Sequence, residues 1–145
     1  MQLSGTHRLA LSRLRVWQLL NDPQVLARAT PGVKTLVPDG EDRFRAELEL
    51  ALGPIRGVFG GNVEVRDKKE PSDLTLRVQG NGTVGGIRAE GKLRLEEDGQ
   101  ETVVHYQGNA LVAGTLAAVG SRLFSGMARK LAAEFFENLQ REGRE

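Results

Sequence analysis

The sequence predicts an α+β domain in which a curved antiparallel sheet of six to seven strands wraps around a long C-terminal helix. Three observations favour this fold. Apolar and polar residues alternate through most of the middle of the chain, which is the period of half-buried strands. Most of the 18 glycines fall in the same region, where turns and bent strands use them. From about Leu116 almost to the end, apolar residues instead recur at the spacing of one helix face.

The length and composition predict a single domain over residues 1–145, long enough to bury a core without disulfides. The chain has no cysteine, which excludes thiolate catalysis and cysteine-based metal sites and fits a reducing compartment. A net charge of +1 gives no overall field that would attract nucleic acid. No signal-peptide pattern opens the chain, and its longest uncharged stretch, Gly108 to Ser121, is shorter than the roughly 20 residues that cross a bilayer. We therefore expect a cytoplasmic protein with at most peripheral contact at the inner face of the membrane.

Two short helices are predicted after a first strand over Gln2 to Ala10. Ser12 suits the N-cap of the first helix because its hydroxyl can accept a hydrogen bond from a free backbone N–H. The run Asn21-Asp22-Pro23 ends that helix and begins a second one, since proline is tolerated in the first turn. Thr30-Pro31-Gly32 ends the second helix.

The next strands are predicted from strict alternation. The expected strands cover residues 44–52, 55–65, 74–78, 87–95 and 102–106. Asp98-Gly99 is a strong hairpin signal between the last two. The final helix, expected to run unbroken from about Leu116 for about 25 residues, would be about 37 Å long. Its single apolar stripe needs an equally long partner surface, which the concave side of the sheet supplies.

The facing surfaces of sheet and helix are predicted to leave a cavity. Gly57, Gly61, Ala89 and Gly91 alternate with large residues on the inner face and do not fill the volume. We expect a cavity of about 300–1,000 Å³, a size typical of ligand sites. The alternative is an ordinary core in which sheet and helix fill one another. The expected lining residues are Leu48, Phe59, Val63, Leu76, Ile87, Leu93, Tyr106, Leu123 and Met127.

Few residues of the predicted inner face carry chemistry. Tyr106 could bond either the backbone or a ligand carbonyl. His7 and His105 are the only histidines, and neither has partners at metal-ligand spacing. A core histidine is the favoured interpretation of His7 over a catalytic base. No inward carboxylate pair or nucleophile motif is present, so we predict no catalytic residue, no metal site and no cofactor.

The uncharged stretch before the last helix permits two interpretations. Gly114 and Gly120 could form a hinge or gate, or the stretch could be a tight, buried crossing. Its apolar residues could also contact a membrane or a partner protein.

This arrangement resembles the START-like (SRPBCC), or helix-grip, superfamily, and within it the family of the G subunit of carbon monoxide dehydrogenase. The resemblance covers nearly all of the chain and depends on the order and spacing of several short motifs. They are Val16-Trp17, Asn21-Asp22-Pro23, Pro31-Gly32, Gly53-Pro54, Gly57, Gly60-Gly61, Gly82, Gly85-Gly86, Gly114, Leu116-Ala117, Val119-Gly120 and Ser121-Arg122-Leu123.

The resemblance implies a carrier of a hydrophobic small molecule, quinone- or lipid-like, that supports a molybdenum-containing carbon monoxide dehydrogenase-type enzyme. Longer members of the family carry a membrane-seeking tail after the helix, and the sequence ends at Glu145 without one. Cavity binding is therefore expected here rather than autonomous anchoring. Two alternatives stay open: a cyclase- or hydrolase-type enzyme that uses the same cavity, and an assembly factor that binds a dehydrogenase by its surface.

Overall fold

The protein is described by a computed structural model that covers residues 1–52 and 55–144. The predicted turn at Gly53-Pro54 lies outside the described residues. Seven strands form one antiparallel sheet in the order β1-β7-β6-β5-β4-β3-β2, which is a meander closed at one edge by β1. The strands are β1 (Gln2–Leu9), β2 (Val33–Pro38), β3 (Arg43–Leu52), β4 (Ile55–Lys69), β5 (Asp73–Gly82), β6 (Gly85–Asp98) and β7 (Glu101–Ala113).

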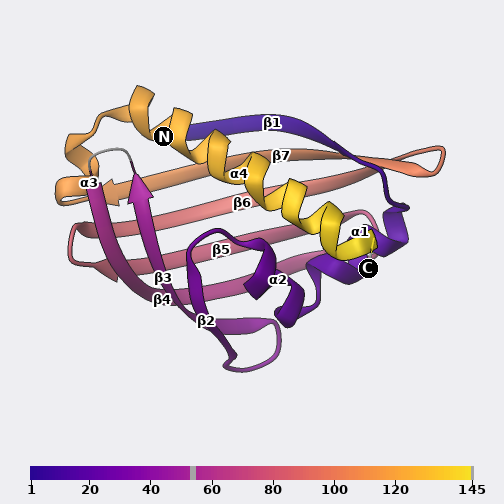
Figure 1. Cartoon of the computed structure of the whole chain (residues 1–145), viewed down its shortest axis with the longest axis horizontal. Coiled ribbons are helices and arrows are strands. Elements are labelled where there is room, and N and C mark those ends of the chain that lie inside the picture. The colour runs from indigo at the N-terminus through magenta and orange to yellow at the C-terminus, as the bar shows by residue number, and fades with distance from the viewer. Residues whose placement is uncertain (53–54, 145) are drawn as a thin grey trace.

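The helices cover one face of this sheet. They are α1 (Arg13–Leu20), α2 (Pro23–Ala29), α3 (Thr115–Ala118) and α4 (Ser121–Arg144). Figure 1 shows α4 lying across the sheet, with α1 and α2 beneath its C-terminal half and α3 at the opposite end of the molecule. The predicted helix-grip architecture, with two short helices after the first strand, is confirmed.

Local hydrogen bonds explain where α1 and α2 begin. The Ser12 hydroxyl accepts from the backbone N–H of Arg15 at 3.3 Å, as predicted for an N-cap. The Asp22 carboxylate accepts from the backbone N–H of Gln24 at 3.0 Å, and Pro23 opens the helix. Both helices therefore begin where the sequence signals place them.

The strands extend further than the alternating pattern predicts. β4 continues to Lys69 through the charged run Arg66-Asp67-Lys68-Lys69, and β7 continues past Gly108 to Ala113. β2 was not among the predicted strands. A register shift between Val33 and Thr35 breaks its alternation, so its pairing with β3 leaves no period-two signal in the sequence.

The prediction of one unbroken C-terminal helix is wrong. The chain forms the four-residue α3 and then the 24-residue α4, separated at Val119 and Gly120. Gly120 has a φ of 85°, a left-handed conformation that interrupts a helix and that glycine adopts most easily. Leu123 lies in the first turn of α4, and its side chain is 47% exposed.

The core consists of two clusters of unequal size. The larger joins α1, α2 and the C-terminal half of α4 to the sheet, and Leu9, Val16, Val104 and Leu139 are fully buried there. α2 and α4 are tied by the Asn138 side-chain amide, which donates to the Ala29 carbonyl at 3.0 Å. The smaller cluster contains Phe59 and Leu116, with Val84, Val112 and Met127 packed around them. The two clusters lie at opposite ends of α4.

Two glycines with opposite surroundings provide a test of this packing. We expect Gly126→Ala to raise the free energy of unfolding by about 0.5–1 kcal/mol, because Gly126 lies inside α4 and an added Cβ meets nothing within 4 Å. Gly61→Ala should lower it by about 1–3 kcal/mol. Its Cβ would overlap the Gln79 carbonyl oxygen, so the backbone of β4 or β5 must shift. Urea unfolding of both variants measures the difference, and equal effects would contradict the packing described here.

Candidate ligand-binding cavity

A cavity of about 450 Å³ lies between the sheet and the N-terminal half of α4. It separates the two core clusters, since Leu76 and Val63 on its wall also contact the larger one while Phe59 and Leu116 belong to the smaller. In the N-terminal half of α4 the lining residues are half-buried, whereas Phe136 and Leu139 in the other half are buried. The helix thus seals the core at one end and covers a void at the other.

The void follows from small residues placed opposite one another on the inner face of the sheet. The register pairs Gly91 with Gly108, and Ala89 with Ala110. The backbone at these positions has no side chain long enough to reach α4. An ideal Cβ built on Gly91 meets nothing within 4 Å, so this position faces open space. Because these positions carry only glycine and alanine, no large side chain fills the space between the sheet and α4.

The cavity wall is almost entirely apolar. Side chains reach it from β3, β4, β5 and β6 and from α4, where Ser125 supplies the one polar side chain among the described helical residues of the lining. The polar lining residues of the strands, such as Asn62 and Gln79, occupy the exposed positions of the alternation and border the cavity through their backbone. Such a wall suits a hydrocarbon group and would not repay the desolvation of a charge.

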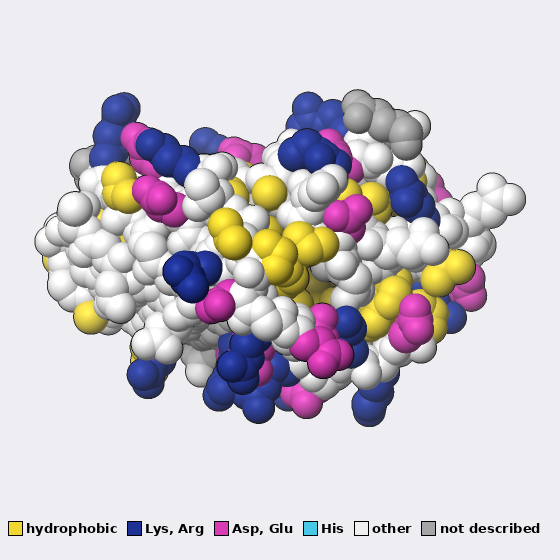
Figure 2. Space-filling view, turned by 90° about the horizontal axis from the view of Figure 1, so that it is seen from below, with side chains coloured by type: hydrophobic (Ala, Val, Ile, Leu, Met, Phe, Trp, Pro, Cys, Tyr) yellow, Lys and Arg dark blue, Asp and Glu magenta, His cyan; other side chains and the backbone are white. Residues whose placement is uncertain are grey.

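A smaller hollow of about 270 Å³ adjoins the cavity, since both are lined by Leu50, Met127 and Leu131, and this makes it the candidate mouth. Its rim adds charged residues, including Glu49 of β3 and Lys130 of α4. The Lys34 ammonium lies 2.8 Å from Glu49 and, by donating a hydrogen bond, holds the pKa of that carboxyl below its ordinary value. Figure 2 looks at the molecule from the side of β2 and β3, where hydrophobic side chains gather around a hollow with charged residues nearby.

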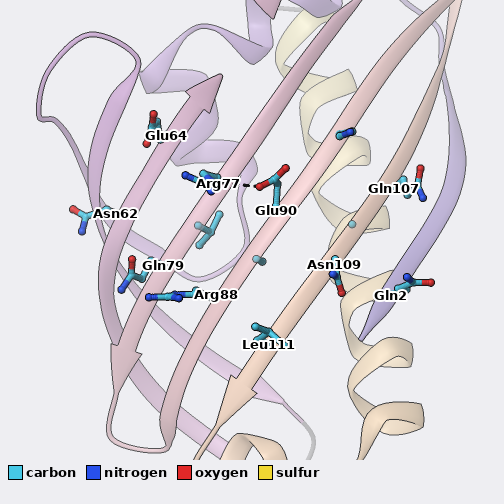
Figure 3. Close-up of a pocket in the computed structure, with 14 residues that line it drawn as sticks. Gln2, Asn62, Glu64, Arg77, Gln79, Arg88, Glu90, Gln107, Asn109 and Leu111 are labelled. Carbon is cyan, nitrogen blue, oxygen red and sulfur yellow. Dashed lines mark hydrogen bonds and ion pairs between the residues drawn. The ribbon is translucent and has the colours of Figure 1, made fainter. Parts of the chain in front are cut away.

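A larger groove of about 780 Å³ lies on the opposite, solvent-facing side of the sheet. Figure 3 shows its polar side chains, with Arg77 and Glu90 joined by an ion pair of 3.3 Å. The groove results from the twist of a sheet whose outer residues are polar and mostly exposed. Charged and amide side chains form most of the lining of this groove, so the inner cavity is the better candidate for a hydrophobic ligand despite its smaller volume.

The structure places six of the nine predicted lining residues along the cavity: Leu48, Phe59, Val63, Leu76, Ile87 and Met127. Leu93 and Tyr106 belong instead to the larger core cluster. The Tyr106 ring lies over Gly5, where an ideal Cβ would come within 2.6 Å of the hydroxyl oxygen, and faces Phe136 at a centroid distance of 5.8 Å. Leu123 does not line the cavity and is exposed. A four-residue repeat drifts about 40° per step around a helix of 3.6 residues per turn, so Leu123 lies off the face that Leu131 presents to the sheet.

Sequence reasoning missed several wall residues. Ala46, Leu50 and Val78 occupy inner positions that the alternation identifies, so their signal was present. Phe124, Ala128 and Leu131 of α4 also line the cavity. Leu131 lies on the predicted apolar stripe of the helix. Phe124 and Ala128 lie beside that stripe, because a four-residue repeat drifts about 40° per step around a helix of 3.6 residues per turn.

Neither histidine lies on the cavity wall. The His7 ring stacks on Phe136 with centroids 5.3 Å apart, which is the environment of a core histidine. His105 lies on the outer face, where its Nε2 is 3.1 Å from a Glu96 carboxylate oxygen. Among the described residues, no group of three or more His, Cys, Asp or Glu side chains could hold a metal ion.

Glycines flank α3, the short helix at the far end of the cavity. Gly114 and Gly120 have φ values of 70° and 85°. The backbone N–H of Leu116 donates to the Val84 carbonyl at 2.9 Å, which holds α3 against the β5–β6 turn. Leu116 is 1% exposed, so it closes this end of the cavity. Whether α3 moves as a gate stays a prediction.

Comparison with known proteins identifies the family. The sequence profile of the carbon monoxide dehydrogenase G subunit (CoxG) matches residues 5–142. The chain belongs to the CoxG family. No curated protein matches this CoxG-family sequence. No helix in the described part of the chain combines the length and apolar character needed to cross a bilayer.

Solved structures share this fold over nearly the whole chain. A conserved protein from Geobacillus kaustophilus is 32% identical, with a TM-score of 0.96, covering 99% of this chain and 95% of its own. A START superfamily protein from Mycobacterium smegmatis is 15% identical, with a TM-score of 0.78 and coverage of 99% and 97%. The Zhui aromatase/cyclase from Streptomyces sp. R1128 is 11% identical, with a TM-score of 0.73 and coverage of 99% and 93%. The last two likenesses show that this CoxG-family chain has the START-like fold.

The cavity can be tested with an apolar fluorescent probe such as N-phenyl-1-naphthylamine. We expect the protein to bind the probe, and Gly91→Leu to weaken binding about tenfold or more, equivalent to about 1.4 kcal/mol, because the new side chain enters the void. Gly60→Leu is the matched control. Gly60 lies on the outer face of β4, between the inward-facing Phe59 and Gly61, and a Cβ added there also meets nothing within 4 Å. Fluorescence titration compares the three proteins. Equal weakening by both substitutions, or no weakening by Gly91→Leu, would contradict binding of the probe in the void.

Proposed function

We propose that this CoxG-family protein is a non-catalytic carrier that holds the apolar part of a quinone- or lipid-like molecule in the cavity under α4. The observation that carries the proposal is the apolar void of about 450 Å³, which small inner-face residues keep open. Burial of a hydrocarbon chain in such a site is favourable by about 25 cal/mol per Å² of apolar surface removed from water. A molecule with a long chain gains most from it.

The orientation of the ligand follows from where polar groups occur. Within the cavity Ser125 offers a single hydroxyl, whereas the mouth is rimmed by Glu49, Lys130 and Glu134. A polar headgroup placed at the mouth can keep its contact with water while the chain enters the void. This favours an isoprenoid or acyl chain as the buried part and a quinone ring or lipid headgroup as the exposed part.

The family supports a link to a molybdenum-containing carbon monoxide dehydrogenase-type enzyme. We infer that the carrier serves such an enzyme by handling the hydrophobic molecule to which electrons pass. Surface binding to the enzyme without a ligand, as an assembly factor, is the alternative that the same family membership permits. Blocking the cavity should abolish the effect of a carrier on the dehydrogenase, whereas an assembly factor should keep its effect.

Enzymatic activity is the weaker alternative. The START-like fold is shared with the Zhui aromatase/cyclase, but catalysis needs ionisable groups that meet in the cavity. The two candidates, His7 and Tyr106, pack against Phe136 in the larger core cluster. A double variant His7→Phe with Tyr106→Phe should therefore leave ligand affinity within about twofold of the parent protein, and turnover that this variant abolished would favour the enzyme.

Solvent extraction tests the carrier directly. Purified protein is extracted, and co-purified quinones and lipids are identified by mass spectrometry. We expect a prenylated or acylated molecule in stoichiometric amount in the parent protein and the Gly60→Leu control, and its loss from Gly91→Leu. Failure of stripped protein to bind any prenylquinone or lipid would contradict the proposal.

A series of alkylquinones tests the chain-in-cavity orientation. Each added methylene is worth about 0.8 kcal/mol, so affinity should rise about fourfold per methylene. The rise should stop at the length that fills the void, and it should stop earlier in Gly91→Leu. Isothermal titration calorimetry measures the series. Affinity independent of chain length would show that the ring, and not the chain, occupies the cavity.

A further inference from the structure

One end of the molecule differs from the rest in charge. We call it the hairpin end and define it by the described residues of 50–60, 80–88 and 109–124. These segments meet in space. Gly86 pairs with Ala113, the Leu116 N–H bonds the Val84 carbonyl, and an ideal Cβ on Gly57 would lie 2.7 Å from the Val84 side chain. Figure 1 shows α3, the β5–β6 turn and the ends of β3 and β7 gathered at this end.

The hairpin end carries arginines and no carboxylate. Its segments contain none of the chain's 19 acidic residues, and their charged residues are Arg56, Arg88 and Arg122. Among the described residues, none of these three arginines belongs to an ion pair. The flanking carboxylates Glu49 and Glu90 are each paired with another cation, Lys34 at 2.8 Å and Arg77 at 3.3 Å. Arginine is therefore the only charged residue type in the described part of the hairpin end, on a protein whose net charge is only +1. At its edge, Arg56 also helps to hold the pKa of the Glu49 carboxyl below its ordinary value.

Exposed apolar side chains accompany these arginines. Of the five large hydrophobic residues exposed in the described part of the chain, three belong to the hairpin end: Val58 at 43%, Leu111 at 67% and Leu123 at 47%. Leu111 pairs across the sheet with Arg88, and both lie toward the same end of the groove in Figure 3. The small residues Ala113, Ala117 and Ala118 between them are also exposed.

We propose that the hairpin end is a docking surface for a bilayer that contains anionic lipids. Arginines attract phosphate headgroups, and apolar side chains between them can enter the boundary of the acyl region. A nucleic acid would match the positive charge but not the exposed Leu111 and Leu123. Docking would place α3, which closes the cavity with Leu116, against the lipid, and this consequence alone depends on the proposed carrier function.

Vesicle binding by the intact protein, without added quinone, tests the surface apart from the cavity. We expect binding to vesicles of phosphatidylcholine with phosphatidylglycerol, and little to phosphatidylcholine alone. Replacing Arg56, Arg88 and Arg122 by Gln should lower the partition coefficient about fivefold per arginine and about 100-fold together. Raised salt should weaken binding, since the Debye length falls from about 10 Å at 0.1 M to about 3 Å at 1 M.

A matched triple variant separates the surface from overall charge. Arg43, Arg94 and Arg144 are exposed and lie outside the hairpin end, and their replacement by Gln removes the same charge. This control should retain binding within a few-fold. An equal loss in both triples, or no binding to anionic vesicles at low salt, would overturn the proposal. A prenylquinone that still binds the Arg56/Arg88/Arg122 variant would show that cavity and surface act separately.

Site-specific fluorescence gives a second readout, because the chain has no cysteine of its own. An environment-sensitive dye attached through Leu123→Cys should shift to the blue on addition of anionic vesicles. The same dye attached through Val37→Cys should not, although Val37 is 56% exposed and equally apolar. A shift at Val37, or at neither position, would contradict docking by the hairpin end.

Discussion

The structure depends on an imbalance of side-chain volume between the two halves of the inner face. Large residues fill the half that faces α1, α2 and the end of α4, while Gly91, Gly108 and their neighbours leave the other half nearly bare. A helix is rigid over its 24 residues, so once its C-terminal half is seated on the core its N-terminal half cannot sink toward the sheet. The hydrogen bond from Asn138 to Ala29 and the ion pair of Arg28 with Glu142 hold the C-terminal half of α4 in this position. The void is thus a product of the same packing that stabilises the fold.

The absence of side chains, rather than the presence of reactive ones, defines the site. Polar groups of the chain are directed to the outer face, where Arg77 meets Glu90 and His105 meets Glu96. To a hydrocarbon ligand, the inner face offers an apolar wall of matching shape and almost no hydrogen-bonding groups. For the proposed carrier, selectivity between ligands would come from chain length and from the rim of the mouth, where Glu49, Lys130 and Glu134 lie.

Much of this could be predicted from the sequence, because it resides in local patterns. The alternation of β3, β4 and β6, the cap at Ser12 and the small residues of the inner face each leave a signal in neighbouring positions. The remainder depends on contacts between distant residues or on one dihedral angle. β2 has a bulge that cancels its period, Tyr106 turns over Gly5, and the φ of Gly120 separates α3 from α4. Alternation identifies which face a strand residue takes, but it does not say how far along the sheet the core ends and the void begins.

The separation of the two core clusters has a consequence for how the protein works in time. The small cluster around Leu116 buries few residues, whereas the large one holds most of the chain's buried leucines and valines. Local opening of the lesser unit costs only a fraction of the free energy of global unfolding. The end around Leu116 can therefore open locally while the other end stays folded. For the proposed carrier, such opening would let a ligand exchange without global unfolding.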